Sequence, residues 1–509
     1  MRDNIKKVFY FLKGLNKEFS LFIFTICLIY AIEAIFHPIL TKLIFDEAVI
    51  RKSLKIFFIL ISSYLFLGIF INLISFFVEL WGKSFENKIL SKILKKTLMS
   101  FYNKDYANIL QKGEGYFIGR VYKDVMEAFP LFISSIRNIS TNLTRVIAFT
   151  SVLIYISWQA TLIMFILIPF IVYFSNLLSQ KIKSATLVER ETESEFINFL
   201  NKNISSYKAV NILNLLGKVL ESTIFAFNKY LNALYRNFKI ITTYNTGIYL
   251  IMNISDFCSL LVGAIFLLKG KMTFGGYLAF VTAFWRSVTA VSQFFAPFAQ
   301  LNKSLTIINR IYEFEKEEKV KFYKVKDEVI LENVCFSYDK NFVFKDFSLR
   351  IKKGEKILIK GPNGSGKTTL ANIMSGLLKV QSGNVILPPR ISSLTLPFEF
   401  PLLKIKELPI KEKLLKDFGL MEFVDKYPHE LSIGNMQKLA IALIFSKEAD
   451  LYILDEPLAN IDKESTKVLM KHILDLSRDK TLVVIMHKGD EWHQFFDRIL
   501  DLKENKKEV

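Results

Sequence analysis

Cysteine is scarce in this sequence: there are three in 509 residues, and none lies near another. This spacing excludes a disulfide framework and a cysteine-rich metal cluster, and it fits the reducing cytosolic side of a membrane. No repeat of the solenoid type is present. No motif for reading nucleic-acid grooves accompanies the formal charge of +19. The first 17 residues are too polar for a secretory signal peptide, and no cleavage site follows them.

Hydrophobic residues, by contrast, are abundant and unevenly placed. They make up 51% of the chain, with 48 phenylalanines and a mean hydropathy of +0.30, which is high for a soluble enzyme. The long apolar stretches end near residue 300, and each can cross a bilayer. They predict six membrane spans, at residues 19–44, 54–77, 129–156, 161–178, 243–268 and 274–299.

The segments between these spans predict the topology. The first, third and fifth spans are followed by short loops, whereas the second and fourth are followed by about 50 and 65 residues rich in lysine and arginine. Because positively charged segments stay on the cytosolic side, the long segments and both termini are expected in the cytosol. This arrangement explains the basic charge without nucleic acid.

Helical periodicity in the cytosolic segments predicts that the membrane helices continue beyond the bilayer. Their turning points are expected at residues 112–116 and 201–211. The first 17 residues place apolar side chains at helical spacing with lysines between them. This pattern predicts a helix lying in the cytosolic interface of the membrane.

Four ionisable side chains lie within the predicted spans: Glu33, Arg145, Asp256 and Arg286. Counting about 1.5 Å per residue from the nearest outer loop places each roughly 18–22 Å deep. Charges at that depth are costly and usually face a cavity or one another. Two interpretations stay open: a polar lining of a substrate cavity, or two ion pairs that fix helix packing.

Residues 361–369 read GPNGSGKTT, between a strand-like run at 356–360 and a helical run at 370–374. Glycines let the backbone N–H groups point at a phosphate, and the helix that follows adds its positive dipole end. Lys367 is expected to reach the β- and γ-phosphates of a nucleotide, and Thr368 to ligate Mg²⁺. The predicted nucleotide-binding residues here are Gly361, Asn363, Gly364, Ser365, Gly366, Lys367, Thr368 and Thr369.

Three side chains after two apolar strands complete the expected chemistry. The strand at residues 450–455 ends in Asp455, which is suited to hold Mg²⁺ through water or through Thr368. Glu456 follows Asp455. Glu456 is expected to act as general base or to orient the attacking water. His487 follows the strand at 481–486 and is expected to contact the γ-phosphate or to hold Glu456 and the water.

Together these motifs resemble the ATP-binding cassette (ABC) transporter family, specifically an exporter-type half-transporter. The resemblance covers essentially the whole chain, and it implies an α-helical membrane domain with six long transmembrane helices, followed by an α/β P-loop ATPase domain. It implies that Tyr338 stacks on adenine and that Asp462 lies at the dimer interface. The signature at the start of the helix near 431–440, with Ser432, Gly434 and Asn435, would serve a nucleotide on the partner chain. Residues 115–124 and 204–210 resemble the two cytosolic coupling segments.

The chain departs from the family pattern at three places. Ile433 and Asn435 stand where the signature Leu-Ser-Gly-Gly-Gln has glycine and its last glutamine. The glutamine expected after residues 391–394 is missing, with Leu396 or Pro397 in its place, and the stretch before the signature is short. A weakened signature beside an intact Glu456 fits one chain of a heterodimer, and a homodimer with two impaired sites is the alternative.

The resemblance implies ATP-driven export of a peptide, a lipid or a hydrophobic small molecule, with ATP and Mg²⁺ as cofactors. A lipid flippase, or a gated or sensor protein that does not pump, is the alternative. The expected partners are a second half-transporter, membrane lipid and an unidentified substrate, but no nucleic acid. The expected location is the bacterial inner (plasma) membrane. The predicted domains are an interfacial helix (1–17), a transmembrane domain (18–312), a linker (313–328) and an ATP-binding cassette domain (329–509).

Overall fold

The computed structural model describes residues 2–49, 52–316, 323–338, 341–395, 398–459, 461, 463–487 and 490–502. The chain divides into two compact units. The first contains Met1–Leu98 and Gly119–Glu315, and the second contains Met99–Ile118 and Lys316–Val509. The second unit therefore takes in a short segment from the middle of the predicted transmembrane domain, in addition to the C-terminal part of the chain.

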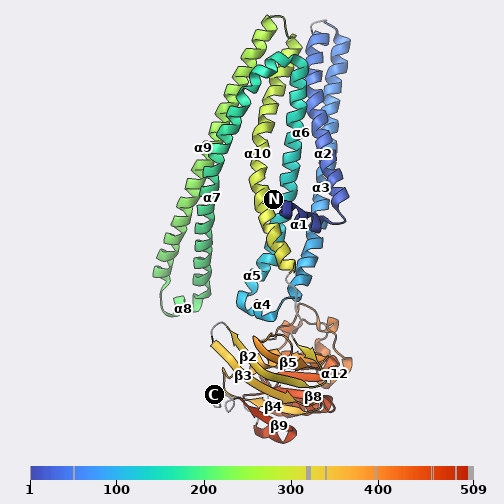
Figure 1. Ribbon diagram of the computed structural model, residues 1–509, viewed down its shortest axis with the longest axis vertical. Helices are drawn as coiled ribbons and strands as arrows, with labels where there is room; N and C mark the ends of the chain where they lie inside the picture. The colour runs from blue at the N-terminus through green and yellow to red at the C-terminus, as the bar shows by residue number, and fades with distance from the viewer. Residues whose placement is uncertain are drawn as a thin grey trace. The chain divides into compact units, whose positions relative to one another are not determined.

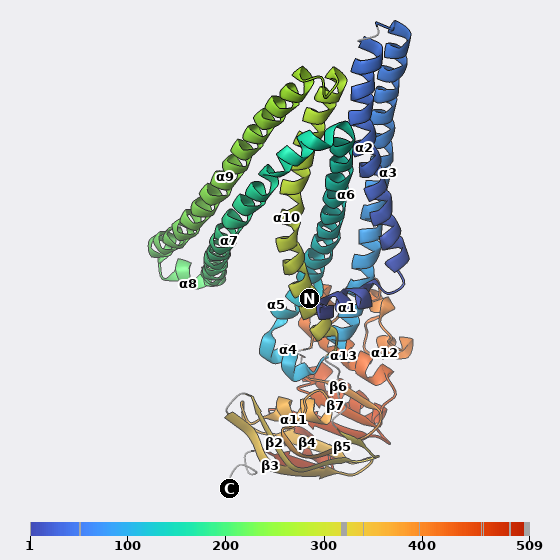
Figure 2. The same cartoon turned by 45° about the horizontal axis from the view of Figure 1, so that its top comes forward.

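The first unit is built from long helices, which Figures 1 and 2 show running alongside one another, with α7 and α9 forming a separate hairpin. Among its described residues the helices are α1 (Arg2–Leu12), α2 (Asn16–Leu43), α3 (Leu54–Tyr102, which continues into the second unit), α6 (Asp124–Phe165), α7 (Leu167–Ser205), α8 (Tyr207–Ile212), α9 (Leu216–Leu268) and α10 (Phe274–Lys316), with π-helical turns η1 (Ile44–Val49) and η2 (Gly119–Lys123).

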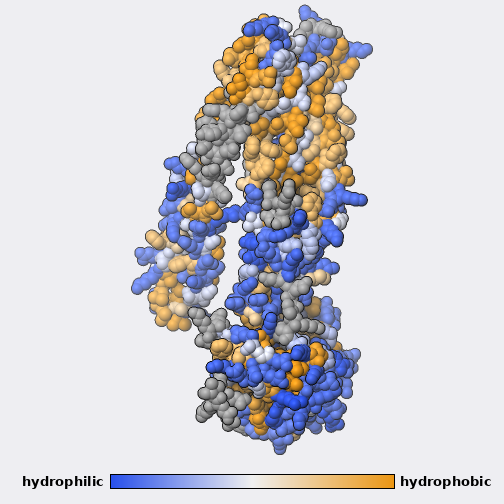
Figure 3. All heavy atoms as spheres, viewed as in Figure 1, coloured by the Kyte–Doolittle hydropathy of each residue, from blue (hydrophilic) through white to orange (hydrophobic). Residues whose placement is uncertain are grey.

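Four helical stretches of the described chain are long and apolar enough to cross a membrane: Asn16–Glu47, Leu54–Tyr102, Glu114–Phe165 and Leu216–Leu268. Figure 3 shows hydrophobic residues covering most of the upper part of this unit, whereas its lower part is mainly hydrophilic with some hydrophobic patches. The two remaining predicted spans fall mainly in α7 and α10, which are 39 and 43 residues long and are not among the four stretches found in the described residues. Their crossing stays a prediction.

The predicted short connection after the third span is a sharp change of direction at one residue. Ser157 has φ −161° and ψ 99° inside α6, so its backbone is extended and the helix breaks there. Its side chain then receives a hydrogen bond from the Ala160 N–H at 3.4 Å, and its carbonyl receives one from the Thr161 hydroxyl at 2.8 Å. Ser157 thus starts the fourth predicted span as a helix cap would.

The N-terminal helix packs on other helices of the first unit through part of its surface. Val8, Phe11 and Leu12 on α1 are buried in the protein, in a cluster with residues of α2, α3, α6 and α10. Lys7 of α1 bonds the Asn309 side chain on α10, and the Tyr10 hydroxyl donates to Glu315 at 2.8 Å. These three apolar residues of α1 therefore pack on other helices, while Phe9 is 54% exposed, and the predicted place of α1 in the membrane interface stays a prediction.

The second unit contains two sheets. A five-stranded parallel sheet has the order β6–β7–β8–β4–β9, and a four-stranded, mostly antiparallel sheet has the order β1–β5–β2–β3. The strands are β1 (Lys324–Val325), β2 (Val329–Tyr338), β3 (Asn341–Ile351), β4 (Lys356–Lys360), β5 (Ser382–Leu387), β6 (Ile391–Leu394), β7 (Leu451–Asp455), β8 (Thr481–Ile485) and β9 (Arg498–Asp501). β7 and β8 are buried along their whole length, as their unbroken apolar sequences require.

Helices and turns connect these strands. In the described residues they are α4 (Tyr106–Lys112), α5 (Glu114–Ile118), α11 (Lys367–Met374), η3 (Ile405–Glu407), α12 (Glu412–Asp417), η4 (Met421–Phe423), η5 (Pro428–Glu430), α13 (Ile433–Ser446), α14 (Lys463–Leu476) and η6 (Asp490–Phe495). The short stretch before the signature accordingly holds one six-residue helix, α12, and three 3₁₀ turns among its described residues.

One segment between the second and third predicted spans packs on the core of the second unit. Asp105 caps α4 by accepting a hydrogen bond from the Ala107 N–H at 3.2 Å, and Gly113 ends the helix at φ 73°. Tyr106 and Ala107 pack against the buried cluster between the two sheets and α11. The contact is therefore made by residues 106 and 107, several residues before the segment expected to couple the two domains (115–124).

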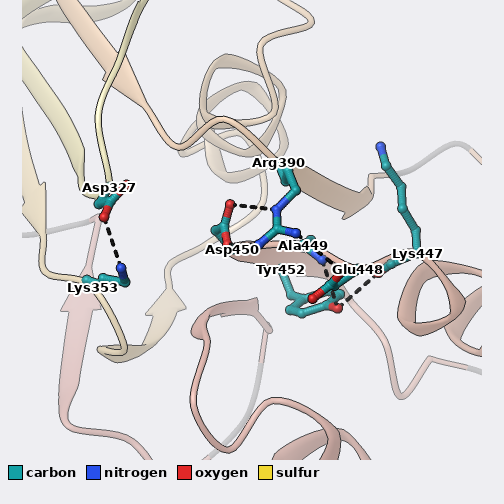
Figure 4. Close-up of polar contacts among 8 residues, drawn as sticks. All are labelled: Asp327, Lys353, Arg390, Lys447, Glu448, Ala449, Asp450 and Tyr452. Carbon is teal, nitrogen blue, oxygen red and sulfur yellow. Dashed lines mark hydrogen bonds and ion pairs between the residues drawn. The ribbon is translucent and has the colours of Figure 1, made fainter.

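Polar contacts fix the N-terminal ends of strands β6 and β7, as Figure 4 shows. Arg390 forms a two-pronged ion pair with Asp450, with N···O distances of 2.7 and 3.1 Å. The Arg390 hydrogen bond is the main reason that the pKa of Asp450 lies below its usual range. The Tyr452 hydroxyl donates to the Lys447 carbonyl at 3.0 Å. These contacts align β6 with β7, so the strands deliver their C-terminal residues at one edge.

Candidate functional site

The predicted nucleotide motifs meet at one edge of the parallel sheet. β8 lies between β7 and β4, and all three strands are parallel. The phosphate loop follows β4, Asp455 ends β7, and His487 comes two residues after β8. Because parallel strands end on the same side, the topology brings these motifs together at the place where open α/β sheets bind ligands.

The phosphate loop has the backbone that its glycines predict. Gly364 and Gly366 have φ of 78° and 97°, in the left-handed region that favours glycine. The Lys367 ammonium donates to the carbonyls of Gly361 and Pro362, at 2.8 and 3.0 Å, so it lies across the loop. The Ser365 hydroxyl is buried and has no hydrogen-bond partner among the described residues. An ammonium and an unpartnered hydroxyl held in one loop suit an anionic ligand.

Thr368 and Asp455 lie in direct contact. The Thr368 hydroxyl donates to the Asp455 carboxylate at 2.7 Å, and Asp455 is buried. A hydroxyl beside a carboxylate is an oxygen donor set of the kind that Mg²⁺ prefers. The two side chains therefore fit the predicted metal role.

Glu456 sits in a strained backbone conformation next to this pair. Its φ is 49°, unusual for a residue with a side chain, and its N–H donates to the Ile485 carbonyl at 2.9 Å. Burial, and then the charge of Asp455, raise the pKa of Glu456. Strain of this kind is retained where surrounding structure imposes it, often at functional sites. The raised pKa corresponds to a higher proton affinity of this carboxyl group, which suits the predicted role of general base.

His487 contacts Glu456 through its backbone. The His487 N–H donates to the Glu456 carboxylate, which lowers the pKa of that group against the larger effect of burial. The imidazole itself is exposed. The structure therefore supplies a contact between His487 and Glu456, with the ring left accessible for a ligand.

Tyr338 lies at the end of β2, where its side chain is 42% exposed and its ring packs edge-on against Phe336. The β2–β3 hairpin also lies close to the phosphate loop. A side chain at Gly366 would bring its Cβ to 2.7 Å from Val343 and 2.9 Å from Phe344. This close approach positions an exposed aromatic ring on the element that borders the loop, as adenine stacking requires.

The signature segment begins a well-capped helix. Ser432 is the N-cap of α13, and its hydroxyl accepts from the Asn435 N–H at 3.3 Å. Ile433, the first residue of the helix, is 61% exposed. Gly434 and Asn435 follow in the first turn. The apolar side chain of Ile433 thus stands at the end of the helix that an anion would approach.

Gln437 is a residue that the sequence interpretation missed. Its side-chain amide donates to the carbonyls of Glu456 and Pro457, both at 3.2 Å, and so ties α13 to the turn after β7. The signal available in the sequence was the position of Gln437 on the same helix, five residues after the cap residue Ser432. Asp462, and the Leu396–Pro397 position of the missing glutamine, lie outside the described residues.

Three of the four predicted membrane charges come together in the first unit. Glu33 of α2 lies 3.7 Å from Arg145 of α6 and 4.0 Å from Arg286 of α10. The Arg145 guanidinium also stacks on Tyr30, 3.9 Å from the ring centre. Both ion pairs therefore share one glutamate, and the choice between a cavity lining and a packing role stays a prediction.

A hollow of about 190 Å³ opens at this cluster. Its lining is Glu33, Arg145, Phe149, Trp285, Arg286, Thr289, Ala290 and Gln293. Asp256 on α9 is not part of that lining, so the expected group of four is reduced to three. The depth of a residue along its helix was predictable, but the direction in which α9 presents Asp256 depends on how the helices pack.

Comparisons with known proteins agree with both parts of the chain. Residues 19–289 match the family model of the ABC transporter transmembrane region, and residues 344–459 match the ABC transporter family model. The subtilin transport ATP-binding protein SpaT of Bacillus subtilis is 25% identical over 567 aligned positions, covering 95% of this chain and 89% of that protein. An ATP-dependent lipid A-core flippase of Desulfotalea psychrophila is 22% identical, covering 88% and 86%. The energy-coupling factor transporter ATP-binding protein EcfA1 of Fusobacterium nucleatum is 31% identical over 198 positions, covering 32% of this chain and 74% of that protein.

The predicted fold class is confirmed, since a helical membrane region precedes an α/β domain with a parallel sheet. The membrane match alone spans more than half of the 509 residues. The chain belongs to the ABC transporter family, with a membrane region and a P-loop ATPase fused in one polypeptide.

Proposed function

We propose that two half-transporters, this chain and a second one, form the working exporter, in which ATP hydrolysis drives a substrate out of the cytosol. The observation that carries the proposal is the meeting of Lys367, Asp455 and Glu456 at one sheet edge, in a chain that also has apolar membrane helices. The second half-transporter would complete each nucleotide site with its signature helix. The proposed location is the bacterial inner membrane, with both termini in the cytosol.

Each residue of the site has a role in the proposed mechanism. Lys367 and the loop N–H groups bind the β- and γ-phosphates of ATP, and Tyr338 stacks on the adenine. Thr368 and Asp455 would hold Mg²⁺, which when bound neutralises phosphate charge. Glu456, held by its contacts to the backbone of Ile485 and His487, accepts a proton from the attacking water. The His487 ring faces the γ-phosphate.

Vectorial movement tests the function. Inside-out vesicles that carry the reconstituted protein should accumulate a fluorescent amphiphile with ATP but not with ADP. The same vesicles, given a headgroup-labelled lipid in the outer leaflet, test the flippase alternative, which the relative named as a lipid A-core flippase favours. ATP hydrolysis without movement of either probe would contradict the exporter.

The altered signature gives a prediction about the partner. We expect the chain purified alone to hydrolyse ATP slowly, because Ile433 places an exposed apolar side chain where the signature has a glycine. Replacing Ile433 with glycine and Asn435 with glutamine together should raise the steady-state ATPase rate of the purified chain about tenfold, equal to about 1.4 kcal/mol of activation free energy. Phosphate release measures the rate, and Val468→Gly on an exposed face of α14 is a matched control that should not raise it.

A partner chain with an intact signature should restore fast hydrolysis to the unmodified protein. Strong ATPase activity from the wild-type chain alone, abolished by Glu456→Gln, would exclude the heterodimer and leave the homodimer.

A further inference from the structure

The charge cluster in the first unit carries more positive than negative charge. Glu33 contributes one negative charge, and Arg145 and Arg286 contribute two positive charges, so the charges lining the hollow sum to +1. Asp256, which could have balanced them, does not line it. A net charge in a membrane-spanning region is costly and marks a functional site unless it is compensated. The structure therefore offers a place where one more negative charge is favourable.

The two arginines also have hydrogen-bonding capacity left. Their distances to Glu33, 3.7 and 4.0 Å, are longer than the 2.7–2.9 Å typical of charge-assisted hydrogen bonds. Each guanidinium carries five N–H donors, and in the described part of the chain neither of these two forms a hydrogen bond to Glu33 that meets normal geometry. The Arg145 guanidinium also lies over the Tyr30 ring, 3.9 Å from its centre, a cation–π contact that uses no hydrogen-bond acceptor.

The hollow has the size of a headgroup and walls of two kinds. Its volume of about 190 Å³ is below the usual range of roughly 300–1,000 Å³ for sites that enclose a whole small molecule. Trp285 and Phe149 provide an apolar wall, and Thr289 and Gln293 of α10 provide polar groups beside the arginines. Such a site encloses a compact polar group while the apolar remainder of the molecule extends outside it.

We propose that Arg145 and Arg286 form a binding site for the anionic headgroup, phosphate or carboxylate, of an amphiphilic molecule. When the site is empty, the Glu33 carboxylate lies beside both guanidinium groups, and it competes with the headgroup for them. This inference rests on the proposed export function only for the statement that the bound amphiphile is the transported substrate. The binding itself requires no ATP and can be measured separately.

Quenching of Trp285 fluorescence measures occupancy of the hollow. The full-length protein is placed in phosphatidylcholine nanodiscs without nucleotide and titrated with bromododecyl phosphate, bromododecanoate and bromododecyl trimethylammonium. Trp285→Phe supplies the blank for the other tryptophans. Half-saturation by the two anions is expected at a concentration about tenfold or more below that of the cation, because the cation meets two guanidinium groups.

Two variants and a control separate a binding site from a packing contact. Arg145→Gln together with Arg286→Gln should raise the half-saturating phosphate concentration about tenfold or more, since the charge-assisted contacts are lost. Glu33→Gln should lower it several-fold, because the competing carboxylate is gone. Arg137→Gln, two turns earlier on α6 and outside the lining, is the matched control and should change nothing.

Equal quenching by the cation and the anions would overturn the anion site, and so would weaker phosphate binding by Glu33→Gln in a folded protein. Repeating the titration in phosphatidylglycerol nanodiscs assigns the source. If phosphatidylglycerol weakens the binding of bromododecyl phosphate, the natural ligand is a headgroup of bilayer lipid. If it does not, the ligand is a separate amphiphile. Both results support an anion site. ATP-driven transport of a cationic amphiphile without anion binding would overturn this inference and leave the exporter intact. Anion binding without any transport would contradict the exporter and leave this inference intact.

Discussion

Glu456→Gln is expected to lower the ATPase rate of the assembled transporter about 10²–10³-fold while ATP still binds, because general-base catalysis contributes on this order. The substitution keeps the shape of the side chain, and it leaves the strained backbone at φ 49° unchanged. It removes the carboxylate whose pKa is raised by burial. Steady-state phosphate release measures the loss, and binding of a fluorescent ATP analogue shows that the site persists.

A control for this variant lies at the other end of the strand that Glu456 follows. Glu448 precedes β7 at the opposite edge of the sheet, where it pairs with Arg390 at 3.3 Å and is exposed. Glu448→Gln makes the same chemical change away from the site, and its ATPase rate should equal that of the wild type. Retention of more than about a tenth of the activity in Glu456→Gln would rule out Glu456 as the base.

Lys367→Ala is expected to weaken ATP binding about 10–100-fold, the equivalent of roughly 1.5–3 kcal/mol for hydrogen bonds to a charged group. The Lys367 ammonium already lies across the loop, on the carbonyls of Gly361 and Pro362. A bound phosphate would therefore meet a cation that needs little reorganisation. Titration with a fluorescent ATP analogue measures the dissociation constant, and thermal unfolding of the variant checks that the domain stays folded.

Lys353→Ala provides the matched change at the other end of the sheet. Lys353 forms an exposed ion pair with Asp327 at 2.9 Å, shown in Figure 4, far along the strand from the phosphate loop. This variant should bind ATP as the wild type does. An unchanged dissociation constant for Lys367→Ala would contradict the assignment of the loop.

The nucleotide motifs could be predicted because their geometry is largely local. Glycine at residues 364 and 366 permits the left-handed turns, and the strand before the loop and the helix after it follow from residues a few positions away. Asp455 and Glu456 were predictable as strand-end acids, since parallel strands share an edge. The membrane helices were predictable from the length of their apolar stretches.

Contacts between distant segments could not be predicted from the sequence, because they depend on how the helices rotate and pack. The sequence placed Glu33, Arg145, Asp256 and Arg286 at similar depths, but the helix packing joined three of them and left Asp256 outside the hollow. The burial of Phe11 on α1 and the hydrogen bonds of Gln437 to the turn after β7 likewise needed the tertiary structure.

The sequence by itself determined that this protein binds a nucleotide and spans a membrane, because both properties depend on residues that are near one another in the chain. Only the tertiary structure decided that one glutamate serves two arginines and leaves a positively charged hollow. The physical reason is that periodicity specifies how far along a helix a side chain lies. The neighbours it meets are decided by side-chain packing between helices that are more than a hundred residues apart in the sequence.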